Sequence, residues 1–569
     1  MCGILVLQTL STKYSPEILR SASETASKLI EYRGENGYRI VEVWPGLFFS
    51  HSRLEINRAA EAAKQPFDTH KNCLVFNGEI YNAAAFDTPY YGNDTHYLFD
   101  KLKQKGGLYH KQIKGMFAYV FADKISKRLF ISRDVFGQKP LYYYLDADLF
   151  FISSSIKALS TALNFIGIRL DLNRESIIFD YIPFGYIREP HTIYKNIYSF
   201  EAGCYRFDGE ELLKLDDGMP SGHQVRSTLD ESYLERCFMS CERPSALLYS
   251  GGVDSSYLMS RFVEYNKNFR VVSHMSDERA KIDPIFSHSA NWAQEKKIYN
   301  FSTSIHDLYN FLDLQMEQPS SDGLQLFCVL NSMKTDFPDT KVFYSGAGGD
   351  EFFGGYNSFK YLEKIFRMPS FLRRFTRFQY LDQPKTENVA DIIQYYYLYR
   401  LDYQLVAQLK MDVSDFVAEG VSRIVNYKTF GVFRNLDLVD NPKFLLKICE
   451  TFDYMKNQII RDTDNIGMAL GMEGRFPLLS NNHIFMRPDG KACMRRRLNN
   501  AFAVTTRKKE GFKHFDSHLH SFYIDYCLNN RELLNSILGL NVDARTFPKL
   551  PLASSRKLCI LLSWLNLNK

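Results

Sequence analysis

The sequence predicts two domains of different fold class: an α+β domain of antiparallel sheets with helices, then an α/β domain with a parallel sheet and a helical C-terminal part. Three observations predict this order. Short apolar strands bounded by turn residues dominate the first ~200 residues. A polar segment rich in glycine and proline follows at residues 216–224. Beyond it, apolar strands alternate with glycine turns and helices, which is typical of a parallel sheet.

The N-terminal domain is expected to combine antiparallel strands with one clear helix. Ser15 can cap this helix, Pro16 suits its first position, and Gly34 ends it. Its apolar stripe consists of Ile18, Leu19, Ala22, Ala26, Leu29 and Ile30. The strands are expected at Ile4–Leu7, Leu47–Ser50, Cys73–Phe76, Phe117–Phe121, Leu129–Ser132 and Leu149–Ser153.

The boundary between the domains is predicted in the polar segment. We expect the first domain to span residues 1–210, a linker to span 211–230, and the second domain to span 231–569. The chain has a mostly helical pattern after Tyr356. Strands of the second domain are expected at Ala246–Tyr249, Val271–His274 and Val342–Tyr344. A ligand site is expected at the carboxyl ends of these strands.

Composition excludes several classes of protein. The net charge of +5 is small against 70 basic and 65 acidic residues, so no nucleic-acid partner is expected. The chain has neither a basic start followed by a long apolar run nor a stretch of ~18 apolar residues. We therefore expect no membrane segment and a cytoplasmic location. Ten cysteines in 569 residues are too sparse for a disulfide scaffold, and most are expected to be buried thiols.

The cysteine in second place can be a nucleophile. Removal of Met1 leaves Cys2 with both a thiol and a free α-amine. An α-amine titrates near ~7.7–8.0, so it can take the thiol proton at neutral pH, as in N-terminal nucleophiles. The alternative is an ordinary chain start in which cysteine follows methionine without a catalytic role.

A glycine turn follows the first strand of the second domain. The residues Ser250-Gly251-Gly252-Val253-Asp254-Ser255-Ser256 stand between an apolar strand and a helix. Glycines let the backbone approach an anion, and the helix start points N–H groups at it, so the turn suits phosphate. Asp254 would repel phosphate and is better explained as a Mg²⁺ ligand. In the alternative interpretation, the Asp and Ser residues only cap the helix.

A second glycine turn, Ser345–Tyr356, follows the strand Val342–Tyr344. It could face the first turn across adjacent strand ends. Asp350 would then join Asp254 in holding Mg²⁺, while Ser345 and Gly346 contact the nucleotide. Neither turn has the spacing of a P-loop or of a dinucleotide-binding fingerprint, which argues against GTPases and dehydrogenases.

Taken together, these motifs resemble those of the glutamine-hydrolysing asparagine synthetase family, and the similarity runs along nearly the whole chain. Besides Cys2-Gly3-Ile4 and the two glycine turns, it rests on Tyr32–Gly34, His51–Leu54, Asn77–Asn82, Gly92–Asp94, Gly115–Ala118, Arg133–Tyr142, Pro183–Tyr186, Arg461–Asp464, Glu473–Leu479 and Arg507–Phe512.

The resemblance implies an N-terminal glutaminase of the N-terminal-nucleophile (Ntn) hydrolase fold. It also implies an ATP-pyrophosphatase-like synthetase domain and an internal path for ammonia. It assigns glutamine attack to Cys2 and the oxyanion hole to Asn77 and Gly78. Arg53 would bind the α-carboxylate of glutamine, and Glu79 and Asp94 would bind its ammonium group, as their charges allow.

The resemblance also implies ATP and Mg²⁺ as cofactors, glutamine and a carboxylate acceptor as substrates, and a possible homodimer. Lys509 corresponds to a catalytic basic residue near the phosphates, with a solvated lysine as the alternative. Asp254 and Asp350 would hold the metal. The expected ATP-binding residues are Leu248, Ser250, Gly251, Gly252, Asp254, Ser255, Met275, Ser345 and Gly346.

One departure from the family pattern concerns the acceptor. Asparagine synthetases commonly carry Glu after the Ser-Gly of the second turn, where this chain has Ala347. Alanine can neither move a proton nor place a charge, so the expected acceptor, aspartate, has alternatives such as a uronic acid. A ring-closing amide synthetase is disfavoured because the predicted glutaminase residues are retained. A non-catalytic nucleotide sensor is disfavoured because Cys2 and both aspartates are present.

Overall fold

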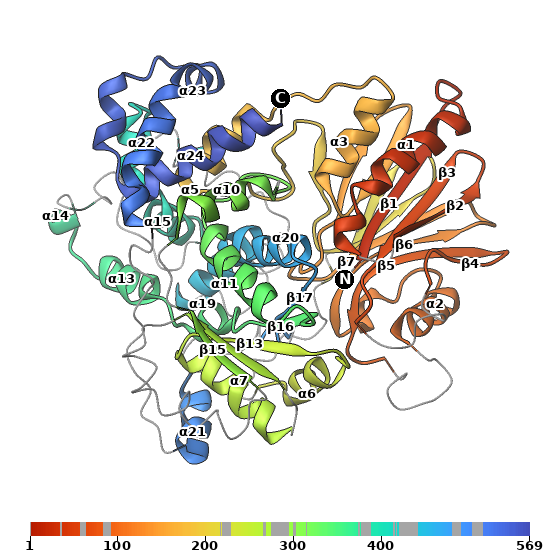
Figure 1. Cartoon of the computed structure of the whole chain (residues 1–569), viewed down its shortest axis with the longest axis horizontal. Helices are drawn as coiled ribbons and strands as arrows, with labels where there is room; N and C mark the ends of the chain where they lie inside the picture. The colour runs from red at the N-terminus through yellow and green to blue at the C-terminus, as the bar shows by residue number, and fades with distance from the viewer. Residues whose placement is uncertain are drawn as a thin grey trace.

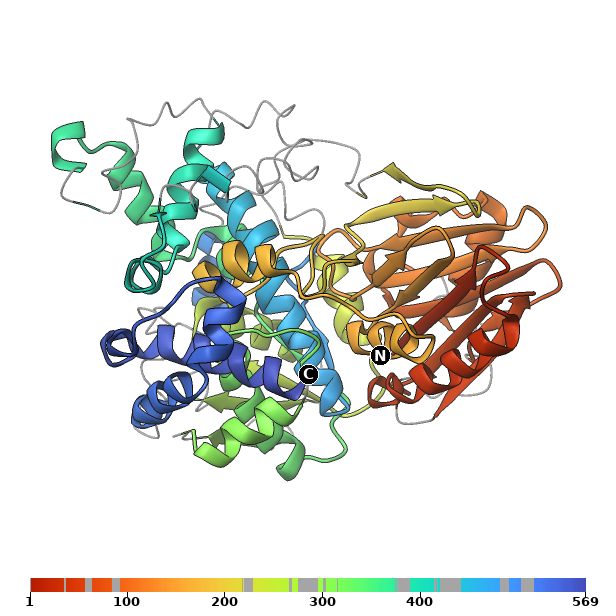
Figure 2. The same ribbon diagram turned by 90° about the horizontal axis from the view of Figure 1, so that it is seen from above.

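The computed structural model describes residues 2–34, 37–56, 64–83, 93–216, 218, 229–265, 269–274, 295–299, 303–314, 316–373, 376, 389–413, 416, 418–419, 442–480, 491–502 and 516–568. Figure 1 shows a body of twisted sheets beside a larger, mostly helical body. The start of β1 lies at the boundary between the two bodies in both Figure 1 and Figure 2. This position brings the N-terminal residues close to the second domain.

Two six-stranded antiparallel sheets form the first body. The first sheet has the order β10 (Ile197–Ser199), β8 (Tyr142–Leu145), β9 (Leu149–Ser153), β1 (Cys2–Thr9), β3 (Leu47–Arg53) and β2 (Tyr38–Trp44). The second has the order β12 (Leu212–Asp216), β11 (Gly203–Phe207), β7 (Arg128–Arg133), β6 (Gly115–Asp123), β5 (Asn72–Ile80) and β4 (Phe67–Asp68). All six strands predicted for this domain are confirmed.

Alternation of side chains along these strands builds a four-layer sandwich. Ile4 and Val6 of β1 meet Val75 of β5 in the core between the sheets. On the outer face of the first sheet, Leu5 and Leu7 pack against α1 (Pro16–Lys28) and α3 (Ile156–Phe165). The helix α2 (Asp94–Lys105) packs against the second sheet.

The predicted first helix begins as expected but ends early. Ser15 accepts a hydrogen bond from the Ile18 backbone N–H, and Pro16 is the first helical residue. The helix ends at Lys28, and a 3₁₀ turn, η1 (Glu31–Arg33), carries the chain to Gly34. Ile18 is 44% exposed, so its place in the predicted apolar stripe was wrong. The remaining stripe is sufficient to cover the sheet.

The second body contains a five-stranded parallel sheet in the order β15-β14-β13-β16-β17. These strands are β15 (Glu295–Tyr299), β14 (Arg270–His274), β13 (Ser245–Tyr249), β16 (Val342–Tyr344) and β17 (Glu473–Arg475). The three predicted strands are confirmed, whereas β15 and β17 were not predicted. Both are short and rich in charged residues, so they lack the apolar pattern of a buried strand.

Helices surround this sheet and fill the rest of the chain that the structure describes, as predicted after Tyr356. None of the described helices is both long and apolar enough to cross a membrane. All ten cysteines are free thiols. The helices are α4 (Arg174–Ser176), η4 (Ile177–Tyr181), α5 (Ile182–Phe184), α6 (Glu231–Met239), α7 (Val253–Glu264), α10 (Ile305–Asp313), α11 (Gly323–Asp336), α12 (Gly349–Phe353), α13 (Asn357–Phe366), α14 (Ser370–Arg373), α15 (Val389–Arg400), α16 (Tyr403–Gln408), α19 (Pro442–Cys449), η6 (Glu450–Ile460), α20 (Arg461–Ala469), α21 (Lys491–Phe502), α22 (His520–Asn529), α23 (Arg531–Leu538) and α24 (Leu552–Leu567), with the 3₁₀ turns η8 (Ser517–Leu519) and η9 (Ala544–Lys549). A further 3₁₀ turn, η3 (His110–Gln112), belongs to the first body.

Strand β12 continues the second sheet to Asp216, and α6 begins at Glu231. Most of the predicted linker, residues 217 and 219–228, lies outside the described residues. The division at residues 211–230 therefore stays a prediction.

Buried ion pairs join the two bodies. The Arg475 guanidinium on β17 lies 3.1 Å from the Glu79 carboxylate on β5 and 2.6 Å from that of Glu473. Arg33 of η1 lies 2.6 Å from Asp464 of α20. Both arginine side chains are fully buried. Burial raises the pKa of Glu473, but Arg475 and Lys139 outweigh it and hold this pKa at about 2. The pair of Arg475 with Glu473 therefore stays ionised at neutral pH.

We expect Arg475→Met to destabilise the protein by roughly 3–5 kcal/mol, because it leaves two buried carboxylates without their cation. A lower urea midpoint measures this loss. Arg497→Met is the matched control, because Arg497 pairs with Glu231 at a site where both side chains are about 40% exposed. Its pair contributes about 0–1 kcal/mol. Equal midpoints for the two variants would contradict a stabilising role for the buried pairs.

Candidate functional sites

The first site forms where β1 and β3 of one sheet meet β5 of the other. Cys2 pairs in register with Arg53, so these two residues lie side by side at the strand ends. The Cys2 backbone nitrogen donates a hydrogen bond of 3.0 Å to the Asn77 Oδ1 atom. This bond connects the two sheets at the predicted nucleophile.

Asn77 presents a hydrogen-bond donor beside Cys2, and Gly78 follows it on β5. The Asn77 Nδ2 atom is buried and has no hydrogen-bond partner among the described residues. Since Oδ1 is held by Cys2, Nδ2 is the part of this amide that remains to bind a ligand. A Cβ atom on Gly78 would lie 2.0 Å from the Met116 carbonyl oxygen, and its φ is +150°, so only glycine fits here. The unpartnered Asn77 Nδ2 atom is a donor of the kind that an oxyanion requires.

Two carboxyl groups follow at the same end of β5. One Glu79 oxygen binds Arg475, and the other is buried without a hydrogen-bond partner among the described residues. Asp94, the first residue of α2, accepts a hydrogen bond of 3.2 Å from the Ile80 N–H. Burial raises the pKa of Asp94 to about 6, despite the N–H groups of Ile80 and Thr95. Burial and the nearby Asp94 charge also raise the pKa of Glu79, despite Arg475. A bound cation would relieve this repulsion.

His51, which lies two residues before Arg53 on β3, also belongs to this site. Its side chain is 2% exposed, and its Nε2 atom lies 3.1 Å from the Phe76 carbonyl oxygen. Burial raises the pKa of the Cys2 thiol, but the nearby His51 ring, the N-terminal charge and the Leu54 backbone N–H lower it to about 7. The sequence analysis quoted His51 within a motif but gave it no role. Its position on the same strand face as Arg53 could have indicated one.

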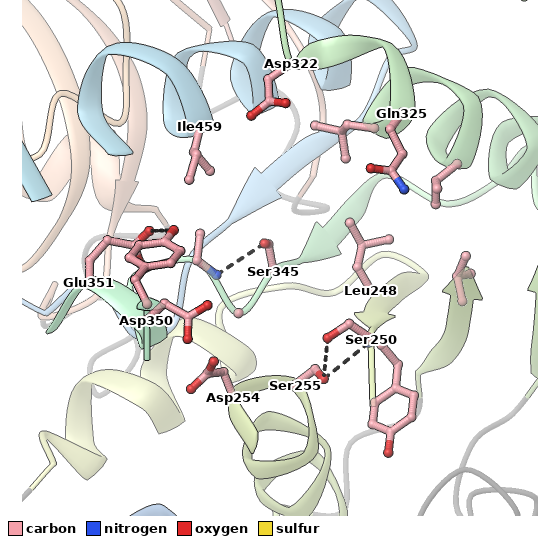
Figure 3. Close-up of a pocket in the computed structure, with 17 residues that line it drawn as sticks. Leu248, Ser250, Asp254, Ser255, Asp322, Gln325, Ser345, Asp350, Glu351 and Ile459 are labelled. Atoms are coloured by element: carbon pink, nitrogen blue, oxygen red, sulfur yellow. Dashed lines mark hydrogen bonds between the residues drawn. The ribbon is translucent and has the colours of Figure 1, made fainter. Parts of the chain in front are cut away.

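The second site is a pocket of about 380 Å³ at the carboxyl ends of β13, β14 and β16 (Figure 3). The two glycine turns form one side of the pocket, and α11 and η6 form the other. Its lining residues from the predicted nucleotide site are Leu248, Ser250, Asp254, Ser255, Ser345, Gly346 and Asp350. Gly251 and Gly252 belong to the same first turn. Met275 and Lys509 lie outside the described residues.

Hydrogen bonds and close packing fix the two turns. The Ser255 hydroxyl accepts a bond of 3.2 Å from the Ser250 N–H and donates one of 3.2 Å to the Gly252 carbonyl oxygen. In the second turn, a Cβ atom on Gly349 would lie 2.3 Å from the Asp254 carboxyl carbon. The turns meet because β13 and β16 are neighbouring strands. This juxtaposition was expected from the sequence.

Lys491 lies between the two predicted metal ligands. Its ammonium group is 2.8 Å from Asp254 Oδ2 and also donates to Asp350 Oδ1. Two carboxylates that converge on one cation fit a partial Mg²⁺ site, which phosphate oxygens could complete. No cluster of three or more His, Cys, Asp or Glu residues suited to a metal occurs in the described part of the chain. Lys491 was not predicted as a site residue, because it comes from α21, far along the chain.

The pocket also contains polar groups beside Ala347. Glu351 accepts hydrogen bonds of 2.9 Å from the Gly348 N–H and 2.5 Å from the Tyr356 hydroxyl. Burial, and then the Asp350 charge, raise the pKa of Glu351 to about 7. Across the pocket, Asp322 and Gln325 point inward from α11 and its start (Figure 3). These groups had not been predicted as site residues.

Comparison with known proteins matches two consecutive parts of the chain to two different families. The sequence matches "Glutamine amidotransferase domain" over residues 1–214 and "Asparagine synthase" over residues 224–484. A Methanocaldococcus jannaschii protein is 26% identical over 426 residues, which are 66% of this chain and 79% of that protein. Its provisional name is glutamine-hydrolysing asparagine synthetase 2. Glutamine-hydrolysing asparagine synthetase 1 of Bacillus subtilis is 26% identical over 336 residues, 53% of this chain and half of that protein.

A solved structure titled as that of the allosteric regulatory enzyme of purine biosynthesis aligns at 13% identity and a TM-score of 0.27, over 52% of this chain and 80% of its own.

The two domain matches follow one another along the chain with only nine residues between them, at positions 215–223. The chain therefore combines a glutamine amidotransferase domain with an asparagine synthase domain.

Proposed function

We propose that the protein hydrolyses glutamine at the first site and uses the ammonia at the second, where ATP activates a carboxylate for amide formation. The observation that carries this proposal is the presence in one chain of the Cys2–Asn77 site and of the pocket at the two glycine turns. Aspartate is the proposed acceptor, and asparagine the product. Because Ala347 stands where asparagine synthetases commonly carry Glu, other carboxylates should be tested as acceptors as well.

In the first half-reaction, Cys2 attacks the carboxamide carbon of glutamine. The negative oxygen of the tetrahedral intermediate would be stabilised by Asn77 Nδ2 and the Gly78 N–H, and loss of one such donor typically costs ~10²–10³ in rate. Arg53 would bind the α-carboxylate of glutamine. Glu79 and Asp94 would bind its ammonium group, which is supported by the raised pKa values of both carboxyls.

In the second half-reaction, the turn from Ser250 to Ser255 would bind the phosphates of ATP, with Leu248, Ser345 and Gly346 beside it. Asp254 and Asp350 would hold Mg²⁺, which neutralises phosphate charge when bound. Because these carboxylates already share Lys491, we propose that the Lys491 ammonium turns toward the phosphates. Met275 against the adenine and Lys509 near the phosphates stay predictions. The acceptor carboxylate would attack the α-phosphorus of ATP and form an acyl-adenylate as pyrophosphate leaves. Ammonia would then attack the acyl carbon, and AMP would leave as the amide forms.

The decisive assay measures pyrophosphate release with ATP, Mg²⁺ and glutamine, in the presence and absence of aspartate. We expect aspartate-dependent release and asparagine in the mass spectrum of the products. Glutamine hydrolysis without aspartate-dependent release of pyrophosphate would show that aspartate is not the acceptor. Uronic acids would then be tested as acceptors. Absence of glutamate formation would contradict the first half-reaction itself.

Cys2→Ala should lower glutamate formation by roughly 10⁴-fold or more, because the nucleophile is lost. Ammonia-dependent pyrophosphate release should stay close to that of the unsubstituted protein, since the second pocket is untouched. Cys73→Ala, a change at a buried thiol of β5, is the matched control and should keep both activities. Loss of both activities in Cys2→Ala alone would argue against two separate sites.

Asp254→Asn should lower the rate of pyrophosphate release by roughly 10²-fold or more, because a neutral amide binds Mg²⁺ poorly. Glutamate formation should persist. Asp336→Asn is the control, because this aspartate pairs with Lys297 on the surface of the same domain. Both variants are assayed for glutamate and pyrophosphate in parallel. Undiminished pyrophosphate release from Asp254→Asn would show that Asp254 is not a metal ligand.

A further inference from the structure

We infer that Lys491 is a built-in counter-ion of the proposed Mg²⁺ site, which holds Asp254 and Asp350 together until Mg²⁺ and ATP displace it as a pair. The inference rests on the proposed binding of both ligands at the second site. It adds that the two ligands bind in a mutually dependent way, because Lys491 and Mg²⁺ compete for the same carboxylate oxygens.

Lys491 joins three separate elements at one point. Asp254 lies in the first turn of α7, Asp350 lies in α12, and Lys491 is the first residue of α21. The Lys491 Nζ atom lies 2.8 Å from Asp254 Oδ2 and also donates to Asp350 Oδ1. An ammonium group has three N–H donors, so it can serve both carboxylates at once. The cluster therefore has one positive charge between two negative charges.

Burial makes this arrangement electrostatically demanding. Lys491 is 8% exposed, and Asp350 is 7% exposed. Removal of one partner from a buried ion pair is costly, because the charge that remains is neither solvated nor neutralised. The two carboxylates therefore need a cation at this position, and the ammonium group needs anions wherever it goes.

The second glycine turn is shaped around the pair. A Cβ atom on Gly355 would lie 2.5 Å from Lys491 Nζ and would overlap Asp350 Oδ1. A Cβ atom on Gly349 would overlap the Asp254 carboxyl group in the same way. Neither of these two glycines has a positive φ. Space for the ion pairs, rather than backbone conformation, therefore requires glycine at both positions.

The oxygens that Lys491 holds are those that a metal would need. Mg²⁺ binds oxygen ligands at about 2.0–2.1 Å, so an ion on Asp254 Oδ2 and Asp350 Oδ1 would take the place of Nζ. Without phosphate nearby, the displaced ammonium group would lose its anions. A triphosphate in the pocket can receive it through charge-assisted hydrogen bonds. Mg²⁺ should therefore bind weakly alone and tightly together with ATP.

The same dependence holds for the nucleotide. If Lys491 leaves for the phosphates and no metal arrives, Asp254 and Asp350 lose their cation beside a negatively charged ligand. ATP without a divalent metal should therefore bind weakly. By linkage, each ligand raises the affinity for the other by the same factor.

Lys491→Met tests the inference through binding rather than turnover. We measure the affinity for Mn²⁺, a paramagnetic substitute for Mg²⁺, by electron paramagnetic resonance without nucleotide. Loss of the competing ammonium group should tighten Mn²⁺ binding by roughly 10–100-fold. Calorimetric titration with ATP at saturating Mg²⁺ should show an affinity weaker by roughly tenfold or more, because a hydrogen bond between charged groups is lost. A merely structural role for Lys491 would weaken both affinities.

Lys297→Met is the matched control, because Lys297 lies 3.3 Å from Asp336 on the surface of the same domain and its side chain is 48% exposed. Both affinities should stay unchanged in this variant. Equal or weaker Mn²⁺ binding by Lys491→Met would overturn the inference. Failure of ATP to bind the unsubstituted protein would instead contradict the proposed function, and the Mn²⁺ comparison would still test the role of Lys491.

Cross-linking of the unsubstituted protein covers the case in which Lys491→Met does not fold. A carbodiimide joins a lysine to an adjacent carboxylate through an amide bond, with loss of one water, and mass spectrometry of the digest identifies the linked peptides. Without nucleotide, Lys491 should be linked to Asp254 or Asp350. Mg²⁺ and ATP together should lower the yield of this link by roughly tenfold or more, whereas Mg²⁺ alone should leave most of it. A link that persists with bound ATP, or that never forms, would overturn the inference.

Discussion

Arg475 is the residue on which the relation between the two sites depends. Its guanidinium contacts Glu79, next to the proposed oxyanion hole, while its carbonyl oxygen accepts a 3.0 Å hydrogen bond from the Ser345 N–H in the second glycine turn. A fully buried cation is tolerated only with close anions, so Glu79 and Glu473 must stay beside it. This requirement holds β5 of one body against β17 of the other. It thereby fixes the position of the first site relative to the pocket of the second site.

The same constraint explains the acidic character of the first site. Glu79 serves two cations, the Arg475 guanidinium through one oxygen and the proposed glutamine ammonium through the other. Asp94 raises the pKa of Glu79, as burial does. A bound ammonium group lowers this electrostatic cost, and so binding energy comes partly from relief of repulsion between the two carboxyls. Binding at the first site is thereby coupled to the charge balance of the interface.

Periodicity and turn chemistry predicted the antiparallel sheets with their helices, the parallel sheet and the meeting of the two glycine turns, because each depends on local pattern and strand adjacency. They could not predict β17, since Glu-Gly-Arg has no apolar pattern and becomes a strand only through its buried partners. Lys491 and His51 were missed for different reasons. Lys491 reaches the two aspartates from a helix distant in sequence. His51 is brought to the first site by strand pairing and by its contact with a carbonyl oxygen on the opposite sheet.

The alanine at position 347 leaves the pocket of the second site with one carboxylate fewer than a glutamate at this position would. Asp254, Asp350, Asp322 and Glu351 already line this pocket, and a triphosphate and an acceptor carboxylate would add negative charge. A further carboxylate at position 347 would raise this repulsion. Glu351, with a pKa near 7, responds to its surroundings instead: a nearby cation favours its ionised form, and an incoming carboxylate favours its protonated form. The protonated form removes one charge as an anionic acceptor enters. Loss of the family carboxylate is therefore compatible with carboxylate activation in this pocket.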